Sequence, residues 1–191
     1  MMLESGIHVM IDLETMSLKP NAAIVSIGAV IFDDVGYNNS FYTSIDPDIY
    51  TVLPSFDIDA STLLWWLKQS PEAIKEAFTS PSAEKSARNA CVKFVNWWDV
   101  NLPPEKTVYI WAQGITFDGI VLEHFLKRFD LVPANWSRYN FRDLRTLRNY
   151  SPEVSLAEKN EMKHNALSDA KYQVKILLEI FRRSKHKKEG E

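Results

Sequence analysis

The N-terminal part of the chain carries apolar and β-branched residues in short, strand-like stretches. Residues 7–13 form the first stretch, and residues 23–32 and 41–45 form two more. Asn21 and the run Asp33-Asp34-Val35-Gly36 supply turn signals between them. This pattern predicts three sequential strands that pair antiparallel.

Helical spacing dominates the rest of the chain. Residues 60–68 fit a short helix, Ser70-Pro71 reads as the cap and first position of another, and residues 82–98 place apolar side chains at three-and-four spacing. The remaining predicted elements are a strand over 107–111, helices over 117–129 and 142–149, a further strand, and a last helix over 166–181. This order predicts a mixed α/β layer domain.

Composition adds limits to this picture. The chain has 191 residues, of which 46% are hydrophobic, which favours one compact domain. We expect that domain over residues 1–184, followed by a flexible basic tail over 185–191. No apolar run is long enough to span a bilayer, and the first residues lack signal-peptide order, so no membrane partner is expected.

The single cysteine and the net charge suggest the setting in which the protein works. Cys91 cannot form an internal disulfide, which favours a reducing cytoplasm, and its helical neighbourhood predicts a buried filler. The net charge of −3 argues against gripping duplex DNA along its length. It remains compatible with holding a few nucleotides at a strand end.

Acidic residues in two places suggest a metal site. Asp12 and Glu14 end the first predicted strand, and residues two apart on a strand point the same way. Paired carboxylates repel each other, and a hard divalent cation such as Mg²⁺ or Mn²⁺ removes that conflict. Asp118 falls in the first turn of a predicted helix. Taken alone, the pair could be a solvated strand face and Asp118 a helix cap.

A histidine and an aspartate near the C-terminus complete the set. His164 precedes the last predicted helix, and Asp169 lies five residues later in its first turn. A histidine that titrates near neutrality can accept a proton from water. An exposed histidine beside a first-turn aspartate is also common, so the signal lies in the coincidence of all three elements in this order.

Together these motifs resemble the DEDDh 3′-5′ exonucleases of the ribonuclease H-like fold. The similarity extends from the first strand to the last helix and is strongest to ribonuclease T-like and phage DexA-like enzymes. It includes the stretches Trp65-Trp66-Leu67 and Phe141-Arg142-Asp143-Leu144-Arg145-Thr146. Two places depart from the family pattern: Gln113-Gly114 stand where many members carry His-Asn, and Ser168 replaces a frequent acid.

The resemblance implies hydrolysis by two divalent cations, Mg²⁺ or Mn²⁺, acting on a single-stranded 3′ end of DNA or RNA and releasing nucleoside 5′-monophosphates. Asp12, Glu14 and Asp169 would hold metal, Asp118 would act through a water or bind a metal, and His164 would deprotonate the attacking water. It also makes a homodimer plausible.

Several residues beside the motifs are candidates for substrate binding. Thr15, Met16, Trp66 and Phe117 are expected near the terminal nucleotide, because apolar and aromatic faces stack on bases. Core packing is the alternative for each aromatic residue, and Trp65 competes with Trp66. Arg142 and Arg145 could contact phosphate or form a solvated, salt-bridged face.

Three rival functions make different predictions. A non-catalytic nucleic-acid-binding module of the same fold predicts damage to the five-residue set, which is intact. Another metal phosphodiesterase, such as a ribonuclease H endonuclease, would cut circular substrates. A structural protein would show no divalent-cation effect on melting. Nothing in the sequence assigns the sugar preference.

Overall fold

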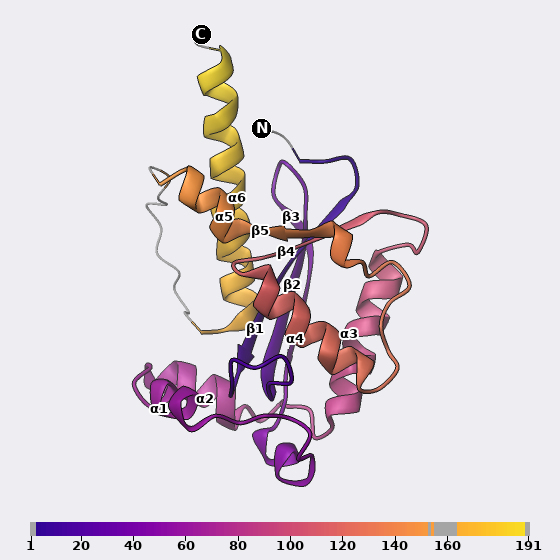
Figure 1. The fold of residues 1–191 in the computed structure, drawn as a ribbon, viewed down its shortest axis with the longest axis vertical. Helices are drawn as coiled ribbons and strands as arrows, with labels where there is room; N and C mark the ends of the chain where they lie inside the picture. Colours follow the sequence, from indigo (N-terminus) through magenta and orange to yellow (C-terminus); the bar gives the residue numbers. More distant parts are fainter. Residues whose placement is uncertain (1–2, 153, 155–163, 190–191) are drawn as a thin grey trace.

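The structure is a computed structural model that describes residues 3–152, 154 and 164–189, with side chains described as far as residue 184. It contains a 5-stranded sheet in the order β3-β2-β1-β4-β5 (Figure 1). The strands are β1 Ile7–Thr15, β2 Ile24–Phe32, β3 Tyr37–Ser44, β4 Val108–Ala112 and β5 Phe141–Asp143.

The sheet is mixed, with β1 at its centre. β1 pairs antiparallel with β2 and parallel with β4, while β3 continues the antiparallel half and β5 the parallel half. The predicted antiparallel order of the first three strands is therefore confirmed. A further strand does precede the last helix, but β5 lies before α5 (Leu144–Tyr150) and includes residues 142 and 143, which were predicted as the start of a helix. This arrangement confirms the expected ribonuclease H-like mixed α/β fold.

The helices follow the predicted order, with shifted ends. They are α1 Ala60–Trp66, α2 Pro71–Thr79, α3 Ala87–Asn101, α4 Ile115–Lys127, α5 Leu144–Tyr150 and α6 Ala166–Glu189, with 3-10 turns η1 Pro47–Val52 and η2 Arg138–Asn140.

Capping explains two of the shifted ends. α3 begins later than predicted because the Ser86 side chain accepts a hydrogen bond from the Asn89 N–H and caps the helix. α4 begins earlier than predicted, at Ile115, whose N–H donates to the Asp143 carboxylate.

α6 continues to Glu189, beyond the predicted end at residue 181. Even so, no helix in the described part of the chain is long and apolar enough to cross a bilayer.

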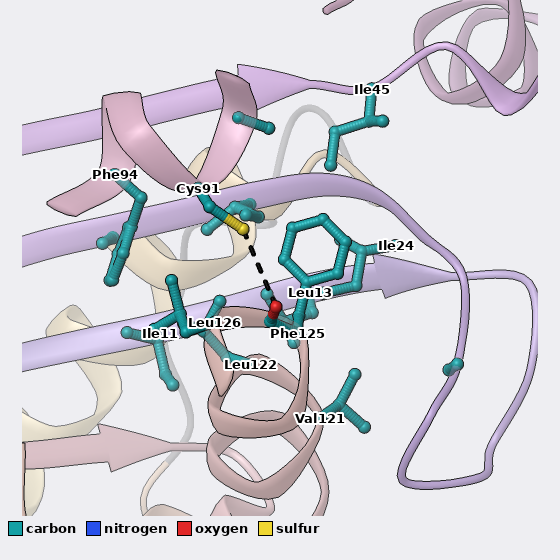
Figure 2. Packing of buried hydrophobic residues seen from close by; sticks show 14 of the residues in the cluster. Ile11, Leu13, Ile24, Ile45, Cys91, Phe94, Val121, Leu122, Phe125 and Leu126 are labelled. Carbon is teal, nitrogen blue, oxygen red and sulfur yellow. Dashed lines mark hydrogen bonds between the residues drawn. The ribbon is translucent and has the colours of Figure 1, made fainter. Parts of the chain in front are cut away.

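Helices cover both faces of the sheet, so β1 and β2 are buried on both sides (Figure 1). Val9, Ile11 and Leu13 point into the larger core cluster, whereas Met10 points into a second cluster formed with α6. Figure 2 shows the larger cluster around Cys91, whose thiol lies 3.8 Å from the carbonyl oxygen of Phe125. Cys91 is fully buried, as predicted, and burial raises the pKa of its thiol to about 12.

The start of α6 lies directly against β2. A Cβ atom at Gly28 would lie 2.3 Å from the carbonyl carbon of Ala166, a distance that no side chain allows. Gly28 is also the residue opposite Asp12 in the β1–β2 register. The missing side chain therefore lets the first turn of α6 approach the sheet beside Asp12.

Candidate active site

Asp12 and Glu14 lie near the end of β1 on the side of the sheet that faces α6. Asp12 is partly exposed, and its Oδ1 accepts a hydrogen bond of 2.6 Å from the Gln173 amide on α6. Glu14 is only 8% exposed. Alternation along the strand places both carboxylates on one side, as predicted, with Leu13 in the core on the other.

Asp118 reaches the same end of β1 from α4. Its side chain is 6% exposed, and its Oδ1 accepts a hydrogen bond of 3.1 Å from the Leu13 N–H, between Asp12 and Glu14 in the strand. A helix cap would bond to its own helix. Asp118 instead joins α4 to β1, so its simple interpretation as a cap is wrong.

His164 and Asp169 reach the site from the start of α6. His164 has a φ of 63°, in the left-handed region, and its backbone N–H donates to Asp169 Oδ2 over 2.8 Å. Potential ligand atoms of Glu14, His164 and Asp169 all lie within 4.8 Å of one another. The structure thus brings together all five residues predicted from the motifs, from β1, α4 and the N-terminal end of α6.

The pKa values of three carboxylates in the site, those of Asp12, Glu14 and Asp118, are raised above their ordinary values. Burial raises the pKa of Asp12 well above its usual value, and the charges of Asp118, Glu14 and Asp169 raise it further, while the bond from Gln173 opposes this. The pKa of Glu14 is raised in the same way by burial, Asp169 and Asp118. Burial raises the pKa of Asp118 to about 7, although the Leu13 N–H lowers it.

This donor set fits a divalent cation. The carboxylates repel one another, and Glu14 and Asp118 are buried, so together as anions they need a counter-charge. Carboxylate oxygens with one imidazole nearby are ligands that divalent cations accept. Glu14, His164 and Asp169 could hold a metal ion, and the carboxylates of Asp12 and Asp118 lie close enough to act on the same charges.

An apolar pocket of about 410 Å³ opens next to the acidic residues. It is lined by the end of β1, by α1 and by Phe117 at the start of α4. The lining residues are Leu13, Glu14, Thr15, Leu18, Ser61, Thr62, Trp65, Trp66 and Phe117. Glu14 belongs both to this pocket and to the acidic cluster, so a molecule in the pocket lies beside Glu14.

The two adjacent tryptophans have different roles. Trp66 is 2% exposed, and its indole N–H donates to the Thr15 carbonyl over 2.9 Å, which fixes α1 to the end of β1. Trp65 is 43% exposed and meets the His164 ring edge-to-face at 4.9 Å. Both tryptophans line the pocket, but Trp65 is the exposed member of the pair and Trp66 forms the buried wall.

The other predicted substrate-binding residues are divided between pocket and core. Thr15 and Phe117 line the pocket. Met16 is 3% exposed, lies in the larger core cluster, and is absent from the pocket lining. The hypothesis that Met16 contacts a terminal base is therefore dropped, because the chain turns the residue after Thr15 inward.

Two residues near the site were missed in the sequence. Gln173 lies four residues after Asp169, on the same face of α6, and that spacing was a usable signal. Asp143 caps α5 through the Thr146 N–H at 2.8 Å and also accepts from the Ile115 N–H at 3.0 Å. Its second bond depends on tertiary structure and left no mark in the sequence.

Comparison with known proteins agrees with this geometry. A family model described as the 3′-5′ exoribonuclease Rv2179c-like domain matches residues 7–181. The exodeoxyribonuclease of Enterobacteria phage T4 is 29% identical over 162 residues, which cover 71% of this chain and 68% of the phage protein.

Solved structures share the fold at low sequence identity. The nuclease domain of 3′hExo, a DEDDh family member bound to rAMP, has a TM-score of 0.61 at 12% identity, covering 93% of this chain and 92% of that one. The zinc-bound complex of E. coli ExoI with single-stranded DNA has a TM-score of 0.67 at 15% identity. It is covered over 41% of its length, by 94% of this chain, so the chain spans less than half of that enzyme.

Proposed function

Because the chain belongs to the Rv2179c-like family of 3′-5′ exoribonuclease domains, we propose that it is a 3′-5′ exonuclease of the DEDDh type. It would remove nucleoside 5′-monophosphates from a single-stranded nucleic-acid end. The observation that supports this most directly is the convergence of Asp12, Glu14, Asp118, His164 and Asp169 beside an apolar pocket.

The pocket suits the terminal nucleoside. The pocket has a volume of about 410 Å³ and is walled by Leu13, Trp65 and Phe117. It would accept any of the bases, since every base offers an apolar face. Glu14 at the pocket edge then faces the sugar-phosphate end of that nucleotide. Because the pocket has room for about one nucleoside and Glu14 is part of its lining, attack at the last phosphodiester of a strand is favoured.

The side chains divide the chemical work. Asp12, Glu14 and Asp169 would bind Mg²⁺ or Mn²⁺, which supplies charge neutralisation for the attacking and leaving oxygens. His164 would take the proton from the attacking water, and Trp65 packs edge-to-face against its ring. Asp118 would orient a water in the site, because its carboxylate is held in place by the Leu13 N–H.

Cleavage of labelled strands tests the proposal. The protein is incubated with 5′-labelled DNA and RNA of one sequence, in Mg²⁺, Mn²⁺ or EDTA. We expect a ladder that shortens from the 3′ end, needs metal, and is absent in Asp12→Ala. Asp34→Ala, which removes an exposed acid in the β2–β3 turn, serves as the matched control and should cut normally.

Substrate form separates the remaining alternatives. A circular single strand should resist cleavage, whereas an endonuclease of the same fold would open it. Binding without cleavage under every metal would favour the non-catalytic module. The family description names RNA and the phage relative is named for DNA, so the ratio of the two rates assigns the sugar.

Two broader expectations belong to the same proposal. A homodimer is expected from the family resemblance, and light scattering on the purified protein tests it. A reducing cytoplasm remains the proposed setting, and the buried position of Cys91 is compatible with it, because this thiol has no partner for an internal disulfide.

A further inference from the structure

Gln113 and Gly114 stand where many family members carry His-Asn, and this leaves space at the N-terminal end of α4. Gly114 caps α4 and has no side chain, and the guanidinium of Arg145 lies over it. A Cβ atom at Gly114 would come within 3.2 Å of Arg145 Nη2 and 3.4 Å of its Cζ. Arg145 thus occupies space beside the first turn of α4, the helix that carries Asp118. A larger residue at position 114 would restrict that space.

Backbone bonds fix this position. The Arg145 N–H donates to the Gln113 carbonyl over 3.0 Å. The Asp143 carboxylate accepts from the N–H groups of both Ile115 and Thr146, which joins the first turns of α4 and α5. These hydrogen bonds fix the first turn of α5, which carries Arg145, relative to the first turn of α4, which carries Asp118.

The charge of Arg145 acts on one side of the acidic cluster. It lowers the pKa of Asp118 against the larger effect of burial. The charges that act on Glu14 are instead those of Asp169 and Asp118. The effect on Asp118 agrees with the position of the Arg145 guanidinium over Gly114, at the start of the helix that carries Asp118.

Within the described residues, the Arg145 guanidinium has no hydrogen bond or ion pair, and the residue is exposed. The other candidate from the sequence, Arg142, pairs with Glu4 at 2.7 Å and lies over the Tyr109 ring. Arg138 is similarly paired with Glu123 at 2.8 Å. Of the two predicted phosphate contacts, the structure therefore favours Arg145, and Arg142 is the salt-bridged one.

We propose that Arg145, seated over Gly114, binds a non-scissile phosphate of the substrate strand, on the 5′ side of the bond that is cut. A planar guanidinium that pairs with none of the described residues suits bidentate binding of a phosphodiester. The ligand class is a single-stranded oligonucleotide with at least one internal phosphate beyond the scissile one. This inference rests on the proposed exonuclease function.

Steady-state kinetics on a labelled single strand give the first test. Arg145→Ala should raise KM about 10-fold or more with little change in kcat, because a contact made equally before and during reaction affects binding alone. Arg145→Lys should recover part of the loss. Gly114→Ala keeps the arginine but crowds it, and should give a smaller rise in KM. Arg148→Ala, one turn further along α5, is the matched control and should change KM less than about twofold.

Neutral linkages identify the contact. Strands carry a single methylphosphonate at the second, third or fourth linkage from the 3′ end. At one of these positions the neutral linkage should raise the KM of the wild-type protein about as much as Arg145→Ala raises it on the native strand. The same linkage should not raise the KM of the Arg145→Ala variant any further. A defect of Arg145→Ala that persists at every neutral position, or an unchanged KM, would overturn the inference.

Binding without turnover gives a reading independent of catalysis. In a His164→Ala background with Mg²⁺, fluorescence anisotropy follows affinity against salt concentration. Arg145→Ala should reduce the slope of log Kd against log salt by about 0.7, the value for one phosphate contact on a single strand. An unchanged slope contradicts the contact. Melting temperatures near that of wild type show that the variants fold, and failure of wild type to cut any native strand would count against the proposed function instead.

Discussion

Gln173 donates from its side-chain amide to Asp12, while its own carbonyl oxygen is buried with no hydrogen-bond partner in the part of the chain that the structure describes. A buried acceptor without a partner costs about 1–3 kcal/mol of stability. The compensating effect is on Asp12, which the amide orients and helps to keep ionised. Gln173 thus acts on the metal site at the expense of the fold.

Replacing Gln173 by leucine should separate these two effects. Gln173→Leu removes both the unpaired oxygen and the bond to Asp12, so the free energy of unfolding should stay within about 1 kcal/mol of wild type. Divalent-metal affinity and kcat/KM should fall about 10- to 100-fold, as expected when a partner that orients a ligand is lost. Calorimetric Mn²⁺ titration and urea unfolding measure the two quantities.

Ser184→Ala is the control for Gln173→Leu, because it removes a side-chain hydrogen bond on the same helix about 16 Å further along the axis. It should leave Mn²⁺ affinity unchanged. Wild-type metal affinity in Gln173→Leu would show that Asp12 needs no support from α6.

Asp118 makes the metal-free protein sensitive to pH. Its folded-state pKa of about 7 lies above the ordinary value of 3.8. Below about pH 4 both folded and unfolded states hold the proton, so the shift costs no stability. As pH rises from about 4 to about 7, the unfolded state loses its proton first, and the free energy of unfolding falls until the folded state ionises as well.

Urea unfolding in EDTA should therefore show lower stability at pH 7.5 than at pH 5.5. Asp118→Asn removes the titrating group but can still accept the Leu13 N–H bond, and it should lessen the decline by more than about 1 kcal/mol. Asp34→Asn, on the exposed β2–β3 turn, should not alter the decline. Equal pH profiles for wild type and Asp118→Asn would mean that Asp118 titrates in its ordinary range.

At the scale of elements, the contact between α6 and β2 sets the distance between two halves of the site. α6 carries Asp169 and follows His164, whereas β1 carries Asp12 and Glu14. Gly28 on β2, opposite Asp12, leaves the space into which the start of α6 fits. Any side chain at that position must displace the start of α6.

Gly28→Ala should for this reason impair activity more than folding. Its Cβ would meet the Ala166 carbonyl carbon at 2.3 Å, and backbone atoms cannot rotate away as a side-chain end would. We expect a loss of about 1–3 kcal/mol in the free energy of unfolding and at least 100-fold lower kcat/KM, because an ångström-scale displacement has that effect on positioned groups.

Gly36→Ala provides a closely matched comparison, because a Cβ at Gly36 meets nothing within 4 Å. It should be neutral in both unfolding and cleavage assays. Similar losses in the two glycine variants would show that backbone entropy, rather than the approach of α6, is the cause.

The elements themselves were largely predictable, and the reasons for the failures are local. β1 and β2 carry enough apolar residues to be recognised because both faces are buried. The start of α3 was placed too early, because the cap is Ser86 rather than Ser82 and both serines precede helical spacing. Residues 37–40 were not assigned to a strand, because their side chains are polar and exposed at the sheet edge.

At the scale of the molecule, the order of motifs identified the five candidate residues, but their contacts required the fold. Glu14 and Asp169 are far apart in sequence, and only the packing of α6 on β1 brings them together. The pairing of Leu13 with Asp118, and the choice between Trp65 and Trp66, depend on the way that α4 and α1 meet the end of β1. Such long-range placement has no periodic signal in the chain.

The assembled cluster links the stability of the whole domain to divalent metal. Three segments converge on it, and in EDTA their carboxylates repel one another. An ion that binds only the folded state stabilises it by RT ln(1 + [L]/Kd), or about 2.7 kcal/mol at a hundredfold excess over Kd. For a chain of this length that is a rise in melting temperature of roughly 5–10 °C.

Thermal melts in EDTA, Mg²⁺ and Mn²⁺ test this link. Wild type should melt higher with either ion, and the rise should be larger at pH 7.5 than at pH 5.5, because protons compete with metal for the carboxylates. Asp169→Asn should abolish most of the rise, while Asp34→Asn should keep it. A metal-induced rise of the same size in Asp169→Asn would mean that the ion binds elsewhere, and the assignment of this cluster as the metal site would then be wrong.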